Sequence, residues 1–293
     1  NMEKIKTKIL ILGSTGMLGH VVFNYFDQQN KYDIYDLVFR NKLRNESIIC
    51  DITNVIQLKD TISSIKPDLI INCIGILIKG SEVKPANAIF INSYFPHLLV
   101  EIADTIAAKI IHISTDCVFS GNKGSYTEGD FCDADDTYGR SKALGEILSD
   151  KHLTLRTSII GPEIKAAGEG LFHWFMNQSG KINGFTDAYW GGVTTLQLAK
   201  SIELALEQEL TGLHQVTNGE RISKYELMKL FKDIWQKNLL TIIAYPGKSV
   251  DKSLVQSGTF NFNIPSYTEM LKKQYDWMSA QQQIYNHYNT KLL

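Results

Sequence analysis

A short apolar run that leads directly into a glycine turn and a helix opens this chain. Residues 9–12 read Ile-Leu-Ile-Leu, and residues 13–19 read Gly-Ser-Thr-Gly-Met-Leu-Gly. The residues that follow form one apolar stripe at helical spacing, made of Leu18, Val21, Val22, Tyr25 and Phe26. A buried strand, a glycine turn and a helix in this order let backbone N–H groups and the positive helix end approach a pyrophosphate. The spacing is GxxGxxG rather than GxGxxG, so the order of elements carries the prediction.

Further apolar runs alternate with helical patterns along the first half of the chain. We expect strands at about residues 33–39, 68–73, 109–114 and 153–160, and a helix at about 92–108. Such alternation predicts an α/β protein with a doubly wound, Rossmann-like parallel sheet. In this architecture ligands bind at the carboxyl ends of the strands.

The end of the second expected strand bears on the choice of dinucleotide. A carboxylate there would favour NAD, because it accepts hydrogen bonds from the adenosine ribose. Phe39 and Arg40 occupy this place, and Arg44 follows. Since a guanidinium can pair with a 2′-phosphate, the sequence favours NADPH, with NADH still possible.

Tyr138 and Lys142 form a Tyr-x-x-x-Lys pair downstream of Ser114-Thr115-Asp116, which ends an apolar strand. Residues four apart on a helix share one face, so the ammonium is expected beside the phenol. A nearby cation would lower the phenol pKa from about 10 and bring proton exchange closer to neutral pH. The pattern predicts proton transfer to a carbonyl or alcohol oxygen.

Together these residues resemble the extended short-chain dehydrogenase/reductase superfamily and, within it, the dTDP-4-dehydrorhamnose reductase-like branch. The resemblance covers nearly all of the first 200 residues. It rests on six stretches, at residues 13–19, 50–53, 71–75, 113–119, 138–146 and 156–162. One departure is Cys117, where that branch usually has an aromatic residue.

The resemblance implies roles for individual residues. Thr115, Tyr138 and Lys142 would be catalytic, with Lys142 also holding the nicotinamide ribose. Asp51 and Ile52 would flank the adenine. The full cofactor-binding set would be Gly13, Ser14, Thr15, Gly16, Met17, Leu18, Gly19, Arg40, Asp51, Ile52, Asn72, Cys73, Ile74, Gly75, Asn92, Tyr138 and Lys142.

After Pro162 the pattern becomes mixed. We expect residues 1–162 to form the nucleotide-binding domain, and residues 163–293 a smaller substrate lobe with some segments returning to the sheet. Aromatic residues at 170–176 and 188–194 could stack a nucleobase, and Lys165, Arg221 and Lys224 could meet a diphosphate. The expected substrate-binding residues are Thr115, Asp116, Cys117, His173, Trp174, Trp190 and Arg221.

These features predict an NADPH-dependent reductase of the C4 ketone in a nucleotide-linked 4-keto-6-deoxyhexose, either dTDP-4-dehydrorhamnose or a UDP-linked 4-keto-6-deoxy-N-acetylhexosamine. Three alternatives stay open. A 4,6-dehydratase would need an acidic residue where Cys117 stands. A bifunctional epimerase/reductase of the GDP-fucose synthase type would use Cys117 and His173. A non-catalytic NADP-binding regulatory subunit would not need the intact triad.

Composition limits the class of partner. A net charge of −1 argues against nucleic acid. The His and Cys residues lack metal-ligand spacing, so no metal is expected. No apolar stretch of spanning length or signal-peptide pattern follows the start, so we expect a cytoplasmic protein, with a homodimer possible. The glycine-rich, acidic stretch 120–136 predicts a long loop before the Tyr138 helix.

Overall fold

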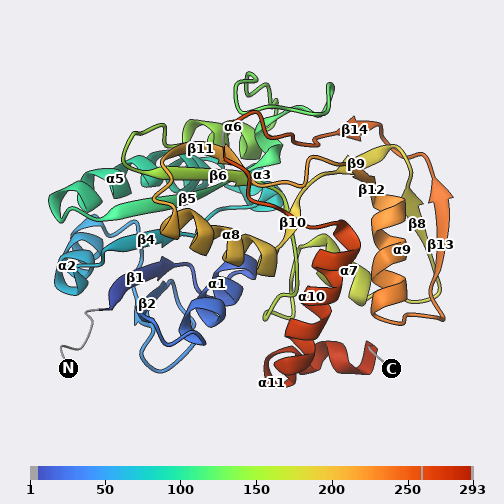
Figure 1. The fold of residues 1–293 in the computed structure, drawn as a ribbon, viewed down its shortest axis with the longest axis horizontal. Helices are drawn as coiled ribbons and strands as arrows, with labels where there is room; N and C mark the ends of the chain where they lie inside the picture. The colour runs from blue at the N-terminus through green and yellow to red at the C-terminus, as the bar shows by residue number, and fades with distance from the viewer. Residues whose placement is uncertain (1–5, 259, 292–293) are drawn as a thin grey trace.

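A seven-stranded parallel sheet forms the centre of the computed structural model, which describes residues 6–258 and 260–291 (Figure 1). Its order is β11-β6-β5-β4-β1-β2-β3. The strands are β1 (Thr7–Leu12), β2 (Tyr32–Val38), β3 (Ile48–Ile49), β4 (Leu69–Asn72), β5 (Lys109–Thr115), β6 (Leu153–Thr157) and β11 (Gly212–Gln215). The predicted doubly wound α/β fold is confirmed.

Helices cover both faces of this sheet, which explains why its strands read as unbroken apolar runs. Ile9 and Ile11 point into a core that includes α1 (Met17–Asp27) and α8 (Thr195–Glu207). Leu10 and Leu12 point to the other face, into a core with α2 (Val55–Ile65) and α5 (Phe95–Thr105). The predicted helix at 92–108 is α5 together with a π-helical turn, η1 (Ile89–Tyr94), that precedes it.

Several short elements lie at the carboxyl ends of the strands. They are α3 (Ile78–Val83), α4 (Pro85–Ala88), η2 (Asp116–Val118) and α6 (Thr137–Leu144). Asp136 caps α6 by accepting a hydrogen bond from the Gly139 N–H at 2.6 Å. Between η2 and α6 the expected loop has no helix or strand. Backbone hydrogen bonds hold it against the C-terminal segment, including a β-bridge between Tyr126 and Leu254 and a bond from the Asp251 N–H to the Gly121 carbonyl.

The expected strand at 153–160 is divided into β6 and β7 (Ile159–Ile160). β7 leaves the main sheet and pairs with β10 (Val193–Thr194). This break occurs where the chain leaves the sheet for the C-terminal lobe.

The C-terminal lobe lies beside the main sheet, to its right in Figure 1. It contains α7 (Leu171–Met176), β8 (Lys181–Phe185), β9 (Ala188–Trp190), β12 (Ile222–Ser223), α9 (Lys224–Ile234), β13 (Thr241–Tyr245), β14 (Val250–Asp251), α10 (Tyr267–Ala280), α11 (Gln282–Tyr285) and η3 (Asn286–Lys291). β11 rejoins the main sheet beside β6, and α8 packs on α1. The division at residue 162 stays a prediction. Among the described helices, none has the length and apolar character that crossing a bilayer requires.

Candidate active site

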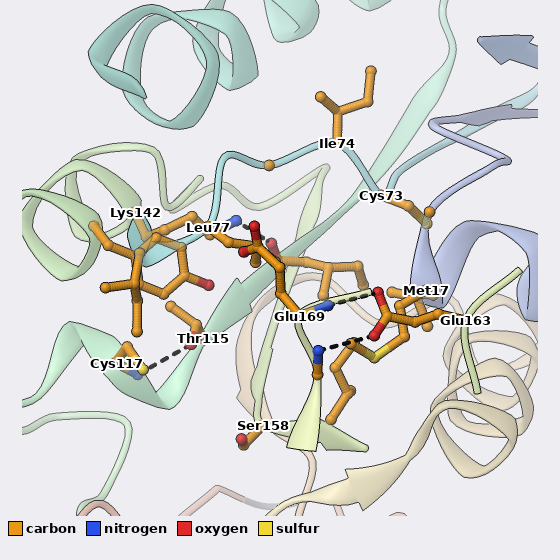
Figure 2. Close-up of a pocket in the computed structure, with 18 of the residues that line it drawn as sticks. Met17, Cys73, Ile74, Leu77, Thr115, Cys117, Lys142, Ser158, Glu163 and Glu169 are labelled. Atoms are coloured by element: carbon orange, nitrogen blue, oxygen red, sulfur yellow. Dashed lines mark hydrogen bonds between the residues drawn. The ribbon is translucent and has the colours of Figure 1, made fainter. Parts of the chain in front are cut away.

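A cavity of about 750 Å³ opens at the carboxyl ends of β1, β4 and β5, where the fold predicts a ligand. Residues from four segments of the chain line it (Figure 2). Three of these segments contain residues that we expected to be catalytic or to bind the cofactor. The four segments are residues 15–18, residues 73–82, residues 113–117 with Tyr138 and Lys142, and residues 157–170. The structure therefore brings Thr115, Tyr138 and Lys142 together with the glycine turn.

The glycine turn has the shape that close approach of a dinucleotide needs. Gly13 has a φ of +81°, in the region that favours glycine. A Cβ built on Gly19 would lie 2.0 Å from the Gly13 carbonyl oxygen, so a side chain there would break the turn. Gly16 caps α1 without a side-chain hydrogen bond. The turn therefore leaves backbone N–H groups at a helix N-terminus for an anionic ligand.

Asp36, on β2, holds this turn in place through hydrogen bonds. Its buried carboxylate accepts hydrogen bonds of 2.6 Å from the Ser14 and Ser47 hydroxyls, and Arg44 Nε donates to it at 3.0 Å. The Ser14 hydroxyl therefore points into the protein, and only its backbone can face a phosphate. The acidic residue inside an apolar strand was the sequence signal for this network, which sequence analysis did not use.

The expected adenine side is only partly as predicted. Arg40 is exposed at the end of β2, with its guanidinium 4.6 Å from the centroid of the Phe39 ring. Asp51 accepts from the Thr53 backbone and hydroxyl. Ile52 is buried in the core with α2 rather than presented as an open flat surface. Arg40 is thus an available cation, whereas Arg44 is held by Asp36.

Asn72 and Asn92 act on the cavity through the loop between them and do not line it. The Asn72 amide oxygen accepts from the Ile74 N–H at 3.2 Å, and its nitrogen lies 3.1 Å from His112 Nδ1. The Asn92 amide bonds both backbone groups of Ile76, at 2.8 and 3.0 Å. The loop they fix presents Cys73, Ile74 and Gly75 to the cavity.

The catalytic candidates lie on β5 and α6. Lys142 Nζ donates to the Ile113 carbonyl at 2.7 Å, and burial lowers the Lys142 pKa to about 8. Burial raises the pKa of Tyr138, electrostatic interactions with Cys117 and Asp116 raise it further, and a hydrogen bond with Thr115 lowers it. The expected lowering of the Tyr138 pKa is therefore wrong for this structure, because desolvation of the phenol raises it. The Tyr138 phenol is therefore neutral at neutral pH.

Cys117 and Asp116 border the same place. The Cys117 N–H donates to Thr115 Oγ1 at 3.1 Å, and burial raises the thiol pKa to about 12. Burial also raises the Asp116 pKa, against the opposing positive charges of Lys252 and Lys224. Both lysines lie close enough to act electrostatically on this end of the site, and sequence analysis named only Lys224.

Residues 7–251 match the family model described as the RmlD substrate binding domain. This chain belongs to that family. The match covers most of the sheet, the cavity and much of the C-terminal lobe.

Two proteins with sequences similar to this family member are a reductase and a subunit of an adenosyltransferase, by their names. The first is dTDP-4-dehydrorhamnose reductase of Aggregatibacter actinomycetemcomitans, 34% identical over 157 residues, which are 52% of this chain and 51% of that protein. The chain thus spans about half the length of that relative. The second is methionine adenosyltransferase 2 subunit beta of Danio rerio, 25% identical over 75% of this chain and 71% of that protein.

The fold of this family member is also found in a crystal structure of dTDP-4-dehydrorhamnose reductase from Bacillus anthracis str. Ames in complex with NADP. The TM-score is 0.78 at 24% identity, over 93% of this chain and 100% of that chain. The two chains therefore share one fold.

Four expected substrate-binding residues of this family member do not line the cavity. His173 is buried between Tyr288 and the Ala166 carbonyl, and Trp174 is partly exposed on α7. Trp190 is a core residue whose indole N–H donates to Ser158 Oγ at 2.9 Å, so it acts by orienting Ser158 at the cavity. Arg221 pairs with Asp251 and stacks on Tyr189.

Other residues from the C-terminal side do line the cavity. Glu163, Ile164, Lys165, Glu169 and Gly170 form one wall. The Glu163 carboxylate accepts from the Gly170 N–H at 2.9 Å and from the Glu169 N–H at 3.4 Å (Figure 2). Of this wall, sequence analysis named only Lys165. No group of three or more His, Cys, Asp or Glu side chains within the described ranges could hold a metal ion.

Proposed function

We propose that this protein reduces the C4 ketone of a nucleotide-diphospho-4-keto-6-deoxyhexose with NADPH. The observation that carries the proposal is the meeting of Thr115, Tyr138 and Lys142 with the glycine turn in one cavity. Membership of the RmlD substrate binding domain family and similarity to a dTDP-4-dehydrorhamnose reductase support a substrate of this kind.

The residues present fit a bound dinucleotide. The glycine turn offers backbone N–H groups at the start of α1, and Lys142 Nζ lies near Gly75, 3.8 Å from a Cβ built there. Arg40 is free of carboxylate partners among the described residues, so it is suited to a 2′-phosphate. NADPH, when bound, supplies the hydride.

The protein's own residues supply the proton and orient the ketone. Tyr138, whose raised pKa keeps the phenol protonated, donates its phenolic proton to the developing alkoxide. Thr115 holds the same oxygen through its hydroxyl, and Lys142 stabilises the phenolate that remains. Lys224 and Lys252 are the cations proposed for the substrate diphosphate, and the effect of their charges on Asp116 supports this role.

The alternatives have less support. Epimerisation of the GDP-fucose synthase type would need Cys117 and His173 at the sugar, but both nitrogens of His173 are engaged away from the cavity. A dehydratase lacks its acid at Cys117. The likeness to methionine adenosyltransferase 2 subunit beta keeps the regulatory role as a second candidate, and the intact triad argues for catalysis.

The proposal is tested by following NADPH oxidation at 340 nm with a panel of 4-keto-6-deoxy nucleotide sugars. The panel contains dTDP-4-dehydrorhamnose and the UDP-linked 4-keto-6-deoxy-N-acetylhexosamine. We expect turnover with at least one of them, and loss of that turnover in Tyr138→Phe. NADPH binding without oxidation of any panel member would favour the regulatory role.

A further inference from the structure

Tyr285 on α11 reaches the glycine-turn wall of the cavity through a histidine. His20 Nδ1 lies 2.8 Å from the Gly16 carbonyl oxygen, which only accepts, so Nδ1 carries the proton. His20 Nε2 therefore accepts the Tyr285 hydroxyl proton, at 2.8 Å. Burial keeps the ring neutral by lowering the His20 pKa to about 4. Tyr285, His20 and Gly16 thus form one tyrosine–histidine–carbonyl relay.

Tyr288, one turn further along, makes a second relay to the wall formed by residues 163–170. His173 Nε2 lies 3.2 Å from the Ala166 carbonyl and donates to it, so Nδ1 accepts from the Tyr288 hydroxyl at 2.5 Å. The same hydroxyl accepts from the Glu163 N–H at 3.1 Å. His287 Nε2 adds a 2.8 Å hydrogen bond to the Glu163 carbonyl.

The two walls that these relays reach are close neighbours in the cavity. Met17 and Glu163 lie beside each other in Figure 2. A Cβ built on Gly170 would lie 2.7 Å from the Met17 terminal methyl carbon. Tyr285 and Tyr288 are 1% and 0% exposed, so both hydroxyls are removed from water and depend on these partners.

We propose that residues 281–288 are a strap that sets the separation of the two walls, with Tyr285 and Tyr288 as positioning residues for the dinucleotide. The inference rests on the proposed cofactor. One short segment holds the carbonyl of the glycine turn and the loop at residues 163–170 at the same time. A change at either tyrosine therefore alters the spacing of both walls, although neither side chain lines the cavity.

The test uses the full chain, with Tyr285→Phe, Tyr288→Phe, the double variant and Tyr267→Phe as matched control. Tyr267 is also buried, and its hydroxyl donates to the Glu220 carbonyl at 2.6 Å, outside the relays. Three quantities are measured: the Kd of NADPH by fluorescence titration, the melting temperature, and amide hydrogen exchange of residues 13–20 and 163–170 without cofactor.

We expect Tyr285→Phe and Tyr288→Phe each to raise the Kd of NADPH by about 3–10-fold, the effect of losing one buried hydrogen bond. Tyr267→Phe should lower the melting temperature by as much as these two variants do, but leave the Kd of NADPH unchanged. The Kd of NADPH for the double variant should lie within about twofold of the Kd for the single variant that binds NADPH less tightly, because breaking one end of the strap already releases it. Tyr285→Phe should also speed exchange at 163–170.

Three results would overturn the strap. They are an unchanged Kd in both single variants, multiplication of the two Kd effects in the double variant, or exchange that changes only at each tyrosine's own wall. Titration of the wild-type protein distinguishes failure of the strap from failure of the proposed function. If the wild-type protein does not bind NADPH, the proposed cofactor is refuted and the relays are not. Either single variant suffices for the exchange test if the other does not fold.

Discussion

The Lys142 ammonium donates a 2.7 Å hydrogen bond to the carbonyl oxygen of Ile113, two residues before Thr115 on β5. This contact connects α6, which carries Tyr138, to β5, which carries Thr115. The lysine is buried and charged, with its pKa lowered to about 8 chiefly by desolvation. A side chain held this way for function costs stability in the cofactor-free protein.

Lys142→Met is expected to stabilise the cofactor-free protein at pH 7 and abolish turnover. A pKa of about 8 instead of 10.5 corresponds to a burial cost of about 3 kcal/mol, offset by about 1–2 kcal/mol from the lost hydrogen bond. Between pH 8 and 10.5 the unfolded chain holds the proton and the folded chain does not, so wild-type stability rises with pH. Urea unfolding at pH 7 and pH 10 should show the advantage shrinking. A variant less stable than wild type at pH 7 contradicts this.

Tyr138→Phe removes the proton donor and keeps the ring. Turnover of the ketone substrate should fall by about 10²–10⁴, while the Kd of NADPH changes by less than about threefold. Stopped-flow reduction and fluorescence titration measure the two quantities. Near-normal turnover would remove Tyr138 from the mechanism, and a large loss of NADPH affinity would mean that the phenol acts mainly in cofactor binding.

Arg40→Ala should reduce the preference for NADPH over NADH. The exposed guanidinium stacks on Phe39, and loss of its pairing with a 2′-phosphate should narrow the affinity gap by about 1–3 kcal/mol. Lys42→Ala is the matched control, because it removes a neighbouring exposed cation that bonds the Asn45 carbonyl. Equal affinities of the unmutated protein for the two cofactors would exclude this role.

The sequence predicted the sheet well because strands buried on both faces must be apolar throughout, as Ile9 to Leu12 are. It also predicted the glycine turn and the Tyr138–Lys142 pair, which lie at one cavity, since both motifs depend on local spacing. Their local geometry is fixed within a few residues of the chain.

The C-terminal side was harder to predict for a physical reason. His173 and Trp190 are residue types that often contact substrates. Here, however, they form hydrogen bonds to Tyr288 and Ser158, which are distant from them in the sequence. The Tyr138 pKa was also misjudged, because spacing gives the distance to Lys142 but not the desolvation of a buried phenol. Long-range burial decided each of these cases.

His20→Gln should make stability less sensitive to acid. The His20 pKa is lowered to about 4 by burial, so between pH 6.5 and 4 the unfolded chain takes up a proton that the folded chain excludes. This lowers the free energy of unfolding by about 3 kcal/mol as pH falls through that window. Urea unfolding at pH 7 and pH 4.5 should show a smaller decline in the variant. An equal decline in both proteins would mean that carboxylates alone cause the acid sensitivity.

Cys117→Ala separates reduction from epimerisation. Epimerisation next to the ketone removes and replaces a carbon-bound proton, whereas C4 reduction adds only a hydride and an oxygen-bound proton. The thiol, with a pKa of about 12, is neutral and poorly suited to take a proton from carbon. In heavy water with unlabelled NADPH, the product should therefore carry no deuterium at C3 or C5 beyond the exchange of substrate alone, and Cys117→Ala should change turnover by less than about threefold. Mass spectrometry measures the label. Enzyme-dependent deuterium that Cys117→Ala abolishes would establish a bifunctional epimerase/reductase instead.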